Sequence, residues 1–297
     1  MRSMRTSTLA LTAALALTMT ACGGSDDDSD VAAPVDTEAS FEAGTRMAEL
    51  AEAGTLRVGT KFDQPLFGLR GLSGEPEGFD VEMAKIVAAK LGIAEGDIEY
   101  VEAVSANREP FLQQNRVDMV IATYTINETR DEVVDFAGPY FLAGQDILVA
   151  KGNPAGITGP EDLKGKRTCS VSGSTPAATM QEQYGLVAGQ DLELVDVYTK
   201  CRDALANGQF DAVTTDNVIL SGYVSAAPDD FELIGAPFTE EPYGIGIPEG
   251  QEEFCDFINE ALAEAAEDGT YAAAFERTAG TVISETPELP APRGCEN

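Results

Sequence analysis

A small set of polar residues occupies three separate places in this chain, each at the end of a predicted strand. In chain order they are Thr123, Thr125 and Arg130, then Ser174 and Thr175, and finally Asp216. They supply a fixed cation, hydroxyl and backbone donors, and a fixed anion. A site for a free α-amino acid needs all three, because both charged ends must be paired when they leave water. Two further arginines, Arg70 and Arg108, indicate a ligand with a second negative charge.

The middle group lies at a predicted helix start. Thr175 precedes Pro176, which favours the first helical position, so Thr175 is the expected N-cap. A helix N-terminus offers free N–H groups to an anion, although plain capping is the alternative. Arg108 also stands near a predicted helix start, where a cation is unfavourable, which indicates another purpose. The GxxxxGK[ST] pattern of a phosphate loop is absent.

The composition excludes several classes of function. The 297 residues include 51 acidic and 19 basic ones, a formal charge of -32, and such a surface repels nucleic acid and anionic lipid headgroups. Histidine is absent, which rules out Ser-His-Asp and Cys-His catalysis, His-ligated zinc and the HExxH motif. We therefore expect no catalytic residues, cofactor or metal, and a local concentration of arginine wherever an anionic ligand binds.

The N-terminus has the three parts of a secretory signal over residues 1–21: a positive start, a short apolar run and small residues before Cys22. Met19-Thr20-Ala21-Cys22 resembles a lipobox, which predicts a lipid on Cys22 and attachment to the outer face of the cell membrane. An ordinary signal with Cys22 left free is the alternative. Residues 22–45 are expected to form a flexible, acidic tether.

The remaining cysteines are even in number, and in an exported chain they indicate disulfides. They are Cys169, Cys201, Cys255 and Cys295. Of the three pairings that four cysteines allow, Cys169–Cys201 with Cys255–Cys295 is favoured, because each bridge would then lie within one lobe of the expected fold. Redox or metal use is the rival interpretation, and neither His nor a CxxC spacing supports it.

Strands and helices alternate in two blocks, which predicts a parallel sheet in each block. Strands over 56–62, 98–102 and 119–124 build the first block, and the alternation restarts after Gly144. A glycine-rich loop is expected between the first strand and Arg70, and Asp80 is the expected N-cap of the helix that follows. A helical stretch over 251–275 has no sheet of its own and is expected to return to the first block. The expected fold has lobe 1 (46–142 plus 243–297) and lobe 2 (143–242), two chain crossings between them, and a ligand cleft at the strand ends.

Several motifs in this order resemble the family 3 extracellular solute-binding proteins, the amino-acid receptors of ABC importers, which have a two-lobed periplasmic-binding-protein-like fold. The motifs are GFDVE at 78–82, DMVIATYTINETR at 118–130, VDF at 134–136 with PYF at 139–141, GST at 173–175, DAVTTD at 211–216 and YGI at 243–245. The segments LRVGTKFDQPLFGLR, ATYTINETR and CSVSGSTPA are similar to the glutamate-binding lipoproteins of Gram-positive glutamate importers.

The resemblance implies a role for each polar group. Arg130 would pair with the ligand α-carboxylate and Asp216 with its α-ammonium, while Thr123 and Thr125 would offer hydroxyl and backbone contacts. The structural alternatives are a surface arginine, a helix-capping aspartate and β-branched residues at a strand end.

Arg70 and Arg108 would face a side-chain carboxylate, with Ser105 as a helper and Lys61 adding positive potential. The implied protein is a binding lipoprotein, not an enzyme, that delivers an acidic amino acid to a membrane permease. An amino-acid sensor for a membrane kinase, or a dehydratase or lyase on the same fold, is the alternative. The sequence does not rank glutamate, aspartate, glutamine and asparagine.

Overall fold

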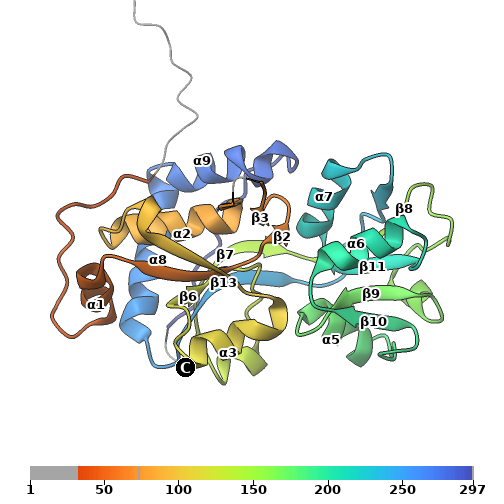
Figure 1. Ribbon diagram of the computed structural model, residues 1–297, viewed down its shortest axis with the longest axis horizontal. Coiled ribbons are helices and arrows are strands. Elements are labelled where there is room, and N and C mark those ends of the chain that lie inside the picture. Colours follow the sequence, from red (N-terminus) through yellow and green to blue (C-terminus); the bar gives the residue numbers. More distant parts are fainter. Residues whose placement is uncertain (1–32, 73, 296–297) are drawn as a thin grey trace, which may run out of the picture.

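The computed structural model describes residues 33–72 and 74–295, which form two lobes built around five-stranded sheets (Figure 1). The expected two-lobed α/β fold is therefore confirmed. The predicted signal peptide, the predicted lipid on Cys22 and the tether as far as residue 32 lie outside the described residues. Within the described ranges, no helix combines the length and the apolar character that crossing a bilayer requires.

The first lobe has the strand order β5-β1-β6-β13-β7. β1 pairs in parallel with β5 and β6, as alternating strands and helices predict, while β13 pairs antiparallel with β6 and β7. The strands are β1 (Leu56–Thr60), β5 (Ile98–Glu102), β6 (Met119–Val120), β7 (Asp135–Ala143) and β13 (Glu241–Ile247). The helices are α1 (Arg46–Ala53), α2 (Phe79–Lys90), α3 (Arg108–Gln113), α4 (Glu128–Asp131), α8 (Glu252–Glu267) and α9 (Thr270–Arg277), with 3-10 turns η1 (Glu95–Asp97), η2 (Ser105–Asn107) and η4 (Ala279–Thr281).

The second lobe has the order β10-β9-β11-β8-β12. β9 pairs in parallel with β10 and β11, and β8 pairs antiparallel with β11 and β12. The strands are β8 (Gln145–Ala150), β9 (Thr168–Val171), β10 (Leu192–Val195), β11 (Ala212–Asp216) and β12 (Phe231–Leu233). The helices are η3 (Pro160–Leu163), α5 (Thr175–Glu182), α6 (Tyr198–Ala206) and α7 (Asn217–Ala226).

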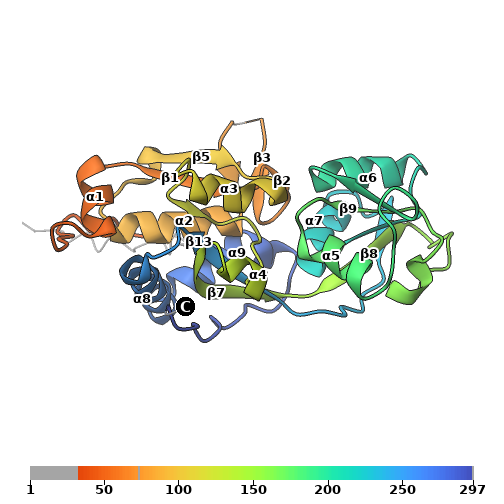
Figure 2. The same ribbon diagram turned by 90° about the horizontal axis from the view of Figure 1, so that it is seen from below.

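Two stretches of chain cross between the lobes. β7 continues into β8 through Gly144, and residues 234–240 lead from β12 into β13. The crossings lie side by side (Figure 2), because Phe238 N–H donates to the Gln145 carbonyl and Gln145 N–H donates to the Thr239 hydroxyl. A Cβ on Gly144 would lie 2.7 Å from the Thr239 carbonyl oxygen, so only glycine allows this close approach.

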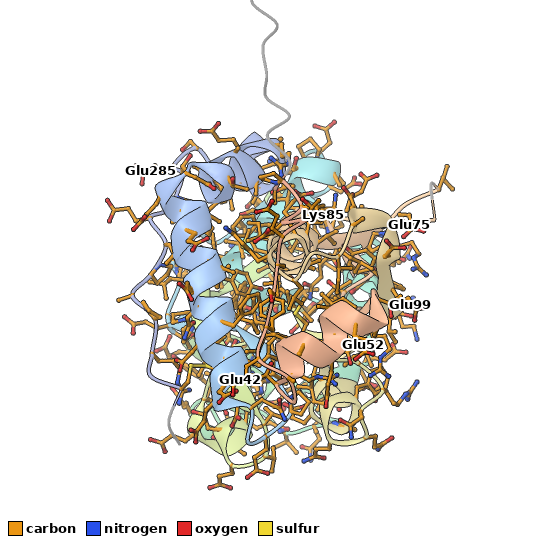
Figure 3. The ribbon with its side chains drawn as sticks, turned by 90° about the vertical axis from the view of Figure 1, so that its left-hand side faces the viewer. Glu42, Glu52, Glu75, Lys85, Glu99 and Glu285 are labelled. Carbon is orange, nitrogen blue, oxygen red and sulfur yellow. A yellow bond between two sulfur atoms is a disulfide. The ribbon has the colours of Figure 1, made fainter. Side chains whose placement is uncertain are left out.

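The C-terminal helices return to the first lobe. α8 packs on β7 and α2, and the Tyr271 and Phe275 rings of α9 pack against Phe79 of α2. The structure contains the disulfides Cys169–Cys201, between β9 and α6, and Cys255–Cys295, between α8 and the C-terminal segment. These are the pairs that the sequence favoured. Figure 3 shows the face that bears α1 and α8, where the exposed glutamates include Glu42, Glu52, Glu99 and Glu285.

The starts of α2 and α5 differ from the predicted N-caps. α2 begins after Gly78, whose Cβ would lie 2.3 Å from the Phe67 carbonyl oxygen, and Asp80 lies inside the helix with its side chain buried. Ser174, not Thr175, caps α5 by accepting from Ala177 N–H. The Asp80 carboxylate and the Thr175 hydroxyl therefore have no capping role and make other contacts.

A small antiparallel sheet was missed from the sequence. It consists of β2 (Asp63–Gln64), β3 (Gly68–Arg70) and β4 (Pro76–Glu77), where we expected a glycine-rich loop. Its strands are too short to show an alternating pattern, and Pro65, Gly68 and Gly71 read as turn residues. The sheet brings Asp63 and Gln64 to the space between the lobes.

Candidate functional site

A small cavity of about 10 Å³ lies between the lobes, where strand ends of both sheets meet. Most of the predicted ligand residues line it, namely Ser105, Arg108, Thr123, Ser174, Thr175 and Asp216. The sequence did not single out the other lining residues, which are Pro176, Tyr198, Thr215 and Ile219. The lining draws on both lobes, so the site is complete only when the lobes are closed.

Two buried guanidinium groups lie together at one side of this site. Arg108 is 2% exposed and Arg130 is 6% exposed, and both lie over the ring of Tyr124. Each also donates across the cleft to the carbonyl oxygen of Gly173, at 3.3 Å from Arg108 and 3.1 Å from Arg130. Their other backbone acceptors are the carbonyl oxygens of Ser105, Ala122 and Thr123 for Arg108, and of Thr125 for Arg130.

These arginines leave an excess of positive charge in a buried place. Arg130 has an ion pair with Glu109, Nε to Oε1 at 3.1 Å, and Arg108 has no ion pair with any described acid. Burial, followed by repulsion from Arg108, lowers the pKa of Arg130 to about 10. A buried cation without a counterion is costly, so the site favours an anionic ligand that pairs with Arg108.

Asp216 brings a carboxyl group to the same cavity. It stands at the N-cap position of α7 but makes no capping bond, and its Oδ2 accepts from the Tyr243 hydroxyl at 2.6 Å. Its buried Oδ1 has no partner among the described residues. Burial, followed by repulsion from Glu241, raises the pKa of Asp216 to about 8. An oxygen in this position calls for a cationic donor.

Thr123 adopts a strained backbone at the edge of the cavity. Its φ is 44°, which is rare for a β-branched residue, and strain of this kind gathers at functional sites. Asp80 Oδ2 accepts its N–H at 2.8 Å, and Asp80 Oδ1 accepts from the Tyr140 hydroxyl. Burial raises the pKa of Asp80 to about 7. Asp80 therefore holds Thr123 in place, a role that the predicted cap position concealed.

The remaining predicted cations are placed differently. Lys61 is 3% exposed, and its Nζ donates to Ser105 Oγ at 2.8 Å, behind the cavity wall. Burial, followed by repulsion from Arg108, lowers the pKa of Lys61 to about 7. Arg70 is exposed on β3, with its guanidinium 3.6 Å above the Phe62 ring, and it does not line the cavity.

The hydroxyls of Thr125 and Thr175 lie 3.3 Å apart across the cleft. Both donate to Glu241, the first residue of β13, which sequence reasoning missed. Nothing local in the sequence marks Glu241, because its partners are 116 and 66 residues away. The one available signal was its position next to the predicted lobe boundary between residues 242 and 243.

Further contacts close the mouth of the cleft on the β2 side. The Asp63 carboxylate accepts from Thr199 N–H in the first turn of α6, a helix without a side-chain N-cap of its own. The Asp63 carbonyl accepts from the Tyr223 hydroxyl at 2.8 Å. A Cβ on Gly222 would lie 2.7 Å from the Pro65 carbonyl oxygen, so the lobes approach as closely as glycine permits.

Comparison with known proteins gives one consistent result. The sequence profile of the bacterial extracellular solute-binding proteins, family 3, matches residues 56–281. The chain is 39% identical over 273 residues to the glutamate-binding protein GluB of Corynebacterium glutamicum, covering 89% of this chain and 86% of that protein. It is 38% identical over 227 residues to the ABC transporter glutamine-binding protein GlnH of Bacillus subtilis, covering 76% and 81%.

Solved structures agree with the sequence relatives. An ancestral arginine-binding protein bound to glutamine matches with a TM-score of 0.69 and 39% identity, over 76% of this chain and 97% of that one. A solute receptor for L-cysteine from Neisseria gonorrhoeae matches with a TM-score of 0.76 and 30% identity, over 82% and 99%.

Proposed function

This chain belongs to the bacterial extracellular solute-binding proteins of family 3. We propose that it captures an acidic amino acid, with glutamate as the preferred ligand, and passes it to the permease of an ABC importer. The observation that carries the proposal is that Arg108 and Asp216, whose Oδ1 is unpartnered, line one cavity, with the buried Arg130 next to Arg108 over the Tyr124 ring. Arg130 would bind the α-carboxylate and Asp216 the α-ammonium.

Charge supports glutamate ahead of glutamine. Arg108 lines the cavity and has no described acid as an ion-pair partner, so a second ligand carboxylate would neutralise it. A glutamine side chain would leave that charge uncompensated. The lipid on Cys22 and attachment to the outer face of the membrane belong to the same proposal, with the motif at residues 19–22 as their support.

Closure is the step that couples binding to transport. The cavity wall comes from both lobes, and ligand contacts that exist only in the closed form shift the population toward that form. The closed form would then be what the permease recognises. A micromolar affinity corresponds to about -8 kcal/mol, which a few charge-assisted hydrogen bonds in an enclosed site can supply.

A thermal-shift panel tests the proposed ligand. Ligand at 100 times its Kd stabilises a protein by about 2.7 kcal/mol, so glutamate should raise the melting temperature by roughly 5–10 °C. Aspartate should have a smaller effect, and lysine and histidine none. Calorimetry with glutamate, aspartate, glutamine and asparagine would give the order of affinity. An equal response to glutamine would remove the case for Arg108 as a carboxylate partner.

Gly222→Ala tests whether closure contributes to affinity. The added methyl group would meet the Pro65 carbonyl only in the closed form, which should weaken glutamate binding about tenfold, within the range for overpacking. Ala also favours α7, so the melting temperature without ligand should not fall. Calorimetry gives the affinity, and small-angle scattering with and without glutamate reports closure. Ser225→Ala, at an exposed position of α7, is the matched control.

A further inference from the structure

Glu241 is a buried acid at the junction of the cavity and the crossings. It is 3% exposed and begins β13, the strand that brings the chain back to the first lobe. Its Oε2 accepts from Thr125 Oγ1 at 2.7 Å and from Thr175 Oγ1 at 2.6 Å. Thr125 follows β6 of the first lobe and Thr175 begins α5 of the second, so one carboxylate oxygen joins the two lobes.

From this geometry we infer that Glu241 is a positioning residue that fixes the polarity of the ligand site. By accepting hydrogen bonds from the hydroxyls of Thr125 and Thr175, it leaves only their oxygen lone pairs to the ligand. A threonine hydroxyl has one hydrogen to donate and two lone pairs to accept with. Because both hydroxyl groups donate to Glu241, the two threonine oxygens can only accept hydrogen bonds from the ligand. They then suit the ammonium end of a ligand, and they offer nothing to an anion or to an apolar group.

The distances decide which acceptor receives the Thr175 hydrogen. Thr175 Oγ1 lies 3.3 Å from Thr125 Oγ1 but 2.6 Å from the Glu241 carboxylate. A short hydrogen bond to a charged acceptor is stronger than a long one between neutral groups, so Thr175 donates its hydroxyl hydrogen to Glu241 and not to Thr125. Thr125 Oγ1 likewise has its single hydrogen committed to Glu241, at 2.7 Å.

The charges around Glu241 point the same way. Asp216 and Glu241 are buried acids close enough for Glu241 to disfavour the ionised form of Asp216. Arg108, Arg130 and the Tyr243 hydroxyl also face Asp216 and act in the opposite sense. Two carboxylates beside two acceptor-only hydroxyls favour a cationic donor, and Arg130, which donates to the Thr125 carbonyl, lies next to them.

Glu241 also reaches the crossings. Its Oε1 accepts from Thr239 Oγ1 at 2.8 Å, and Thr239 Oγ1 accepts from Gln145 N–H at 3.0 Å. A purely structural role, holding the two crossings together, would therefore use the same carboxylate. That role would affect every ligand of the closed cleft equally, whereas a role in polarity would affect only ligands that carry an ammonium group.

Comparison of L-glutamate with glutarate separates these roles, because glutarate has both carboxylates and lacks the ammonium group. The inference rests on the proposed function, and calorimetry on the unaltered protein tests that function first. Wild type should prefer glutamate to glutarate by roughly 10⁴-fold, as a site with unpaired polar groups rejects an analogue that cannot pair them. Glutarate is measured by competition against bound glutamate.

Glu241→Gln should weaken glutamate binding about tenfold and leave glutarate unchanged, so that the preference falls about tenfold. Glu240→Gln is the matched control, since Glu240 is the exposed neighbour and the change is chemically identical. An equal loss for both ligands, or no loss, would overturn the inference while leaving the proposed function intact. If wild type binds no amino acid, the proposed function and this inference fail together.

The pH dependence of glutamate affinity gives a second readout, which can be measured even if the Glu241→Gln variant is partly destabilised. Removing the charge of Glu241 should let Asp216 ionise at lower pH, since Glu241 opposes that ionisation. The rise of glutamate affinity between pH 6 and pH 8 should therefore shift to lower pH in Glu241→Gln and stay in place in Glu240→Gln. An unshifted profile contradicts the assigned role. Melting curves without ligand confirm that each variant is folded.

Discussion

Replacing Arg130 with alanine is expected to weaken glutamate binding about a thousandfold, because a desolvated charge partner contributes roughly 2–5 kcal/mol. The guanidinium is 6% exposed and anchored to the Thr125 carbonyl, so its position is set before a ligand arrives. Arg130→Lys should recover only part of the affinity, since an ammonium cannot form the planar, two-bond contact with a carboxylate. Calorimetry with glutamate measures both variants.

The same substitution should not destabilise the unliganded protein. Burial and the nearby Arg108 both disfavour the charged form of Arg130, and each lowers its pKa. Removing Arg130 relieves that repulsion, so the melting temperature without ligand should stay equal or rise. Arg116→Ala is the control, because Arg116 is exposed and its guanidinium lies over the Phe111 ring, away from the cavity. Comparable glutamate affinity in Arg130→Ala and wild type would refute the assigned role.

The two-lobed fold, apart from the small sheet of β2, β3 and β4, could be predicted from the sequence because the signals for it are local and repeated. Strand and helix patterns alternate over both blocks, and polar residues at the ends of the strands mark the edge where the sheets meet. This is why Thr123, Ser174 and Asp216, from segments far apart in sequence, were predicted together and all line the cavity.

The misses have a different physical origin. Arg70 resembled a ligand residue by its place in the chain, but the short strand β3 carries it to the surface, where it stacks on Phe62. Asp80 looked like a helix cap, whereas the close contact at Gly78 starts the helix earlier and frees the carboxylate. Glu241 acts through hydroxyls on both lobes, and no spacing rule reports contacts of that kind. Sequence patterns thus predict which backbone edge forms a site, while side-chain partners follow from tertiary packing.

Asp216→Asn is expected to reduce glutamate affinity by an amount that depends on pH. Burial and Glu241 raise the pKa of Asp216 to about 8, so the unliganded protein holds this carboxyl mostly protonated at pH 6. A bound ammonium favours the ionised form, and binding must then release a proton. Affinity that depends on this release falls as the pH falls, because protons compete with the ligand.

The comparison of variant with wild type isolates Asp216 from other groups that titrate nearby. Asp80 and Lys61 each have a pKa of about 7, and both are unchanged in the variant. The ratio of the two dissociation constants should therefore rise about 50-fold between pH 6 and pH 8, as linkage to a single proton requires. Calorimetry in buffers of different ionisation heat should detect release of nearly one proton at pH 7 by wild type, and a smaller release by the variant. A ratio that stays constant with pH would mean that Asp216 is already ionised without ligand, and that Tyr243 and the two arginines, rather than an arriving ammonium, satisfy its charge.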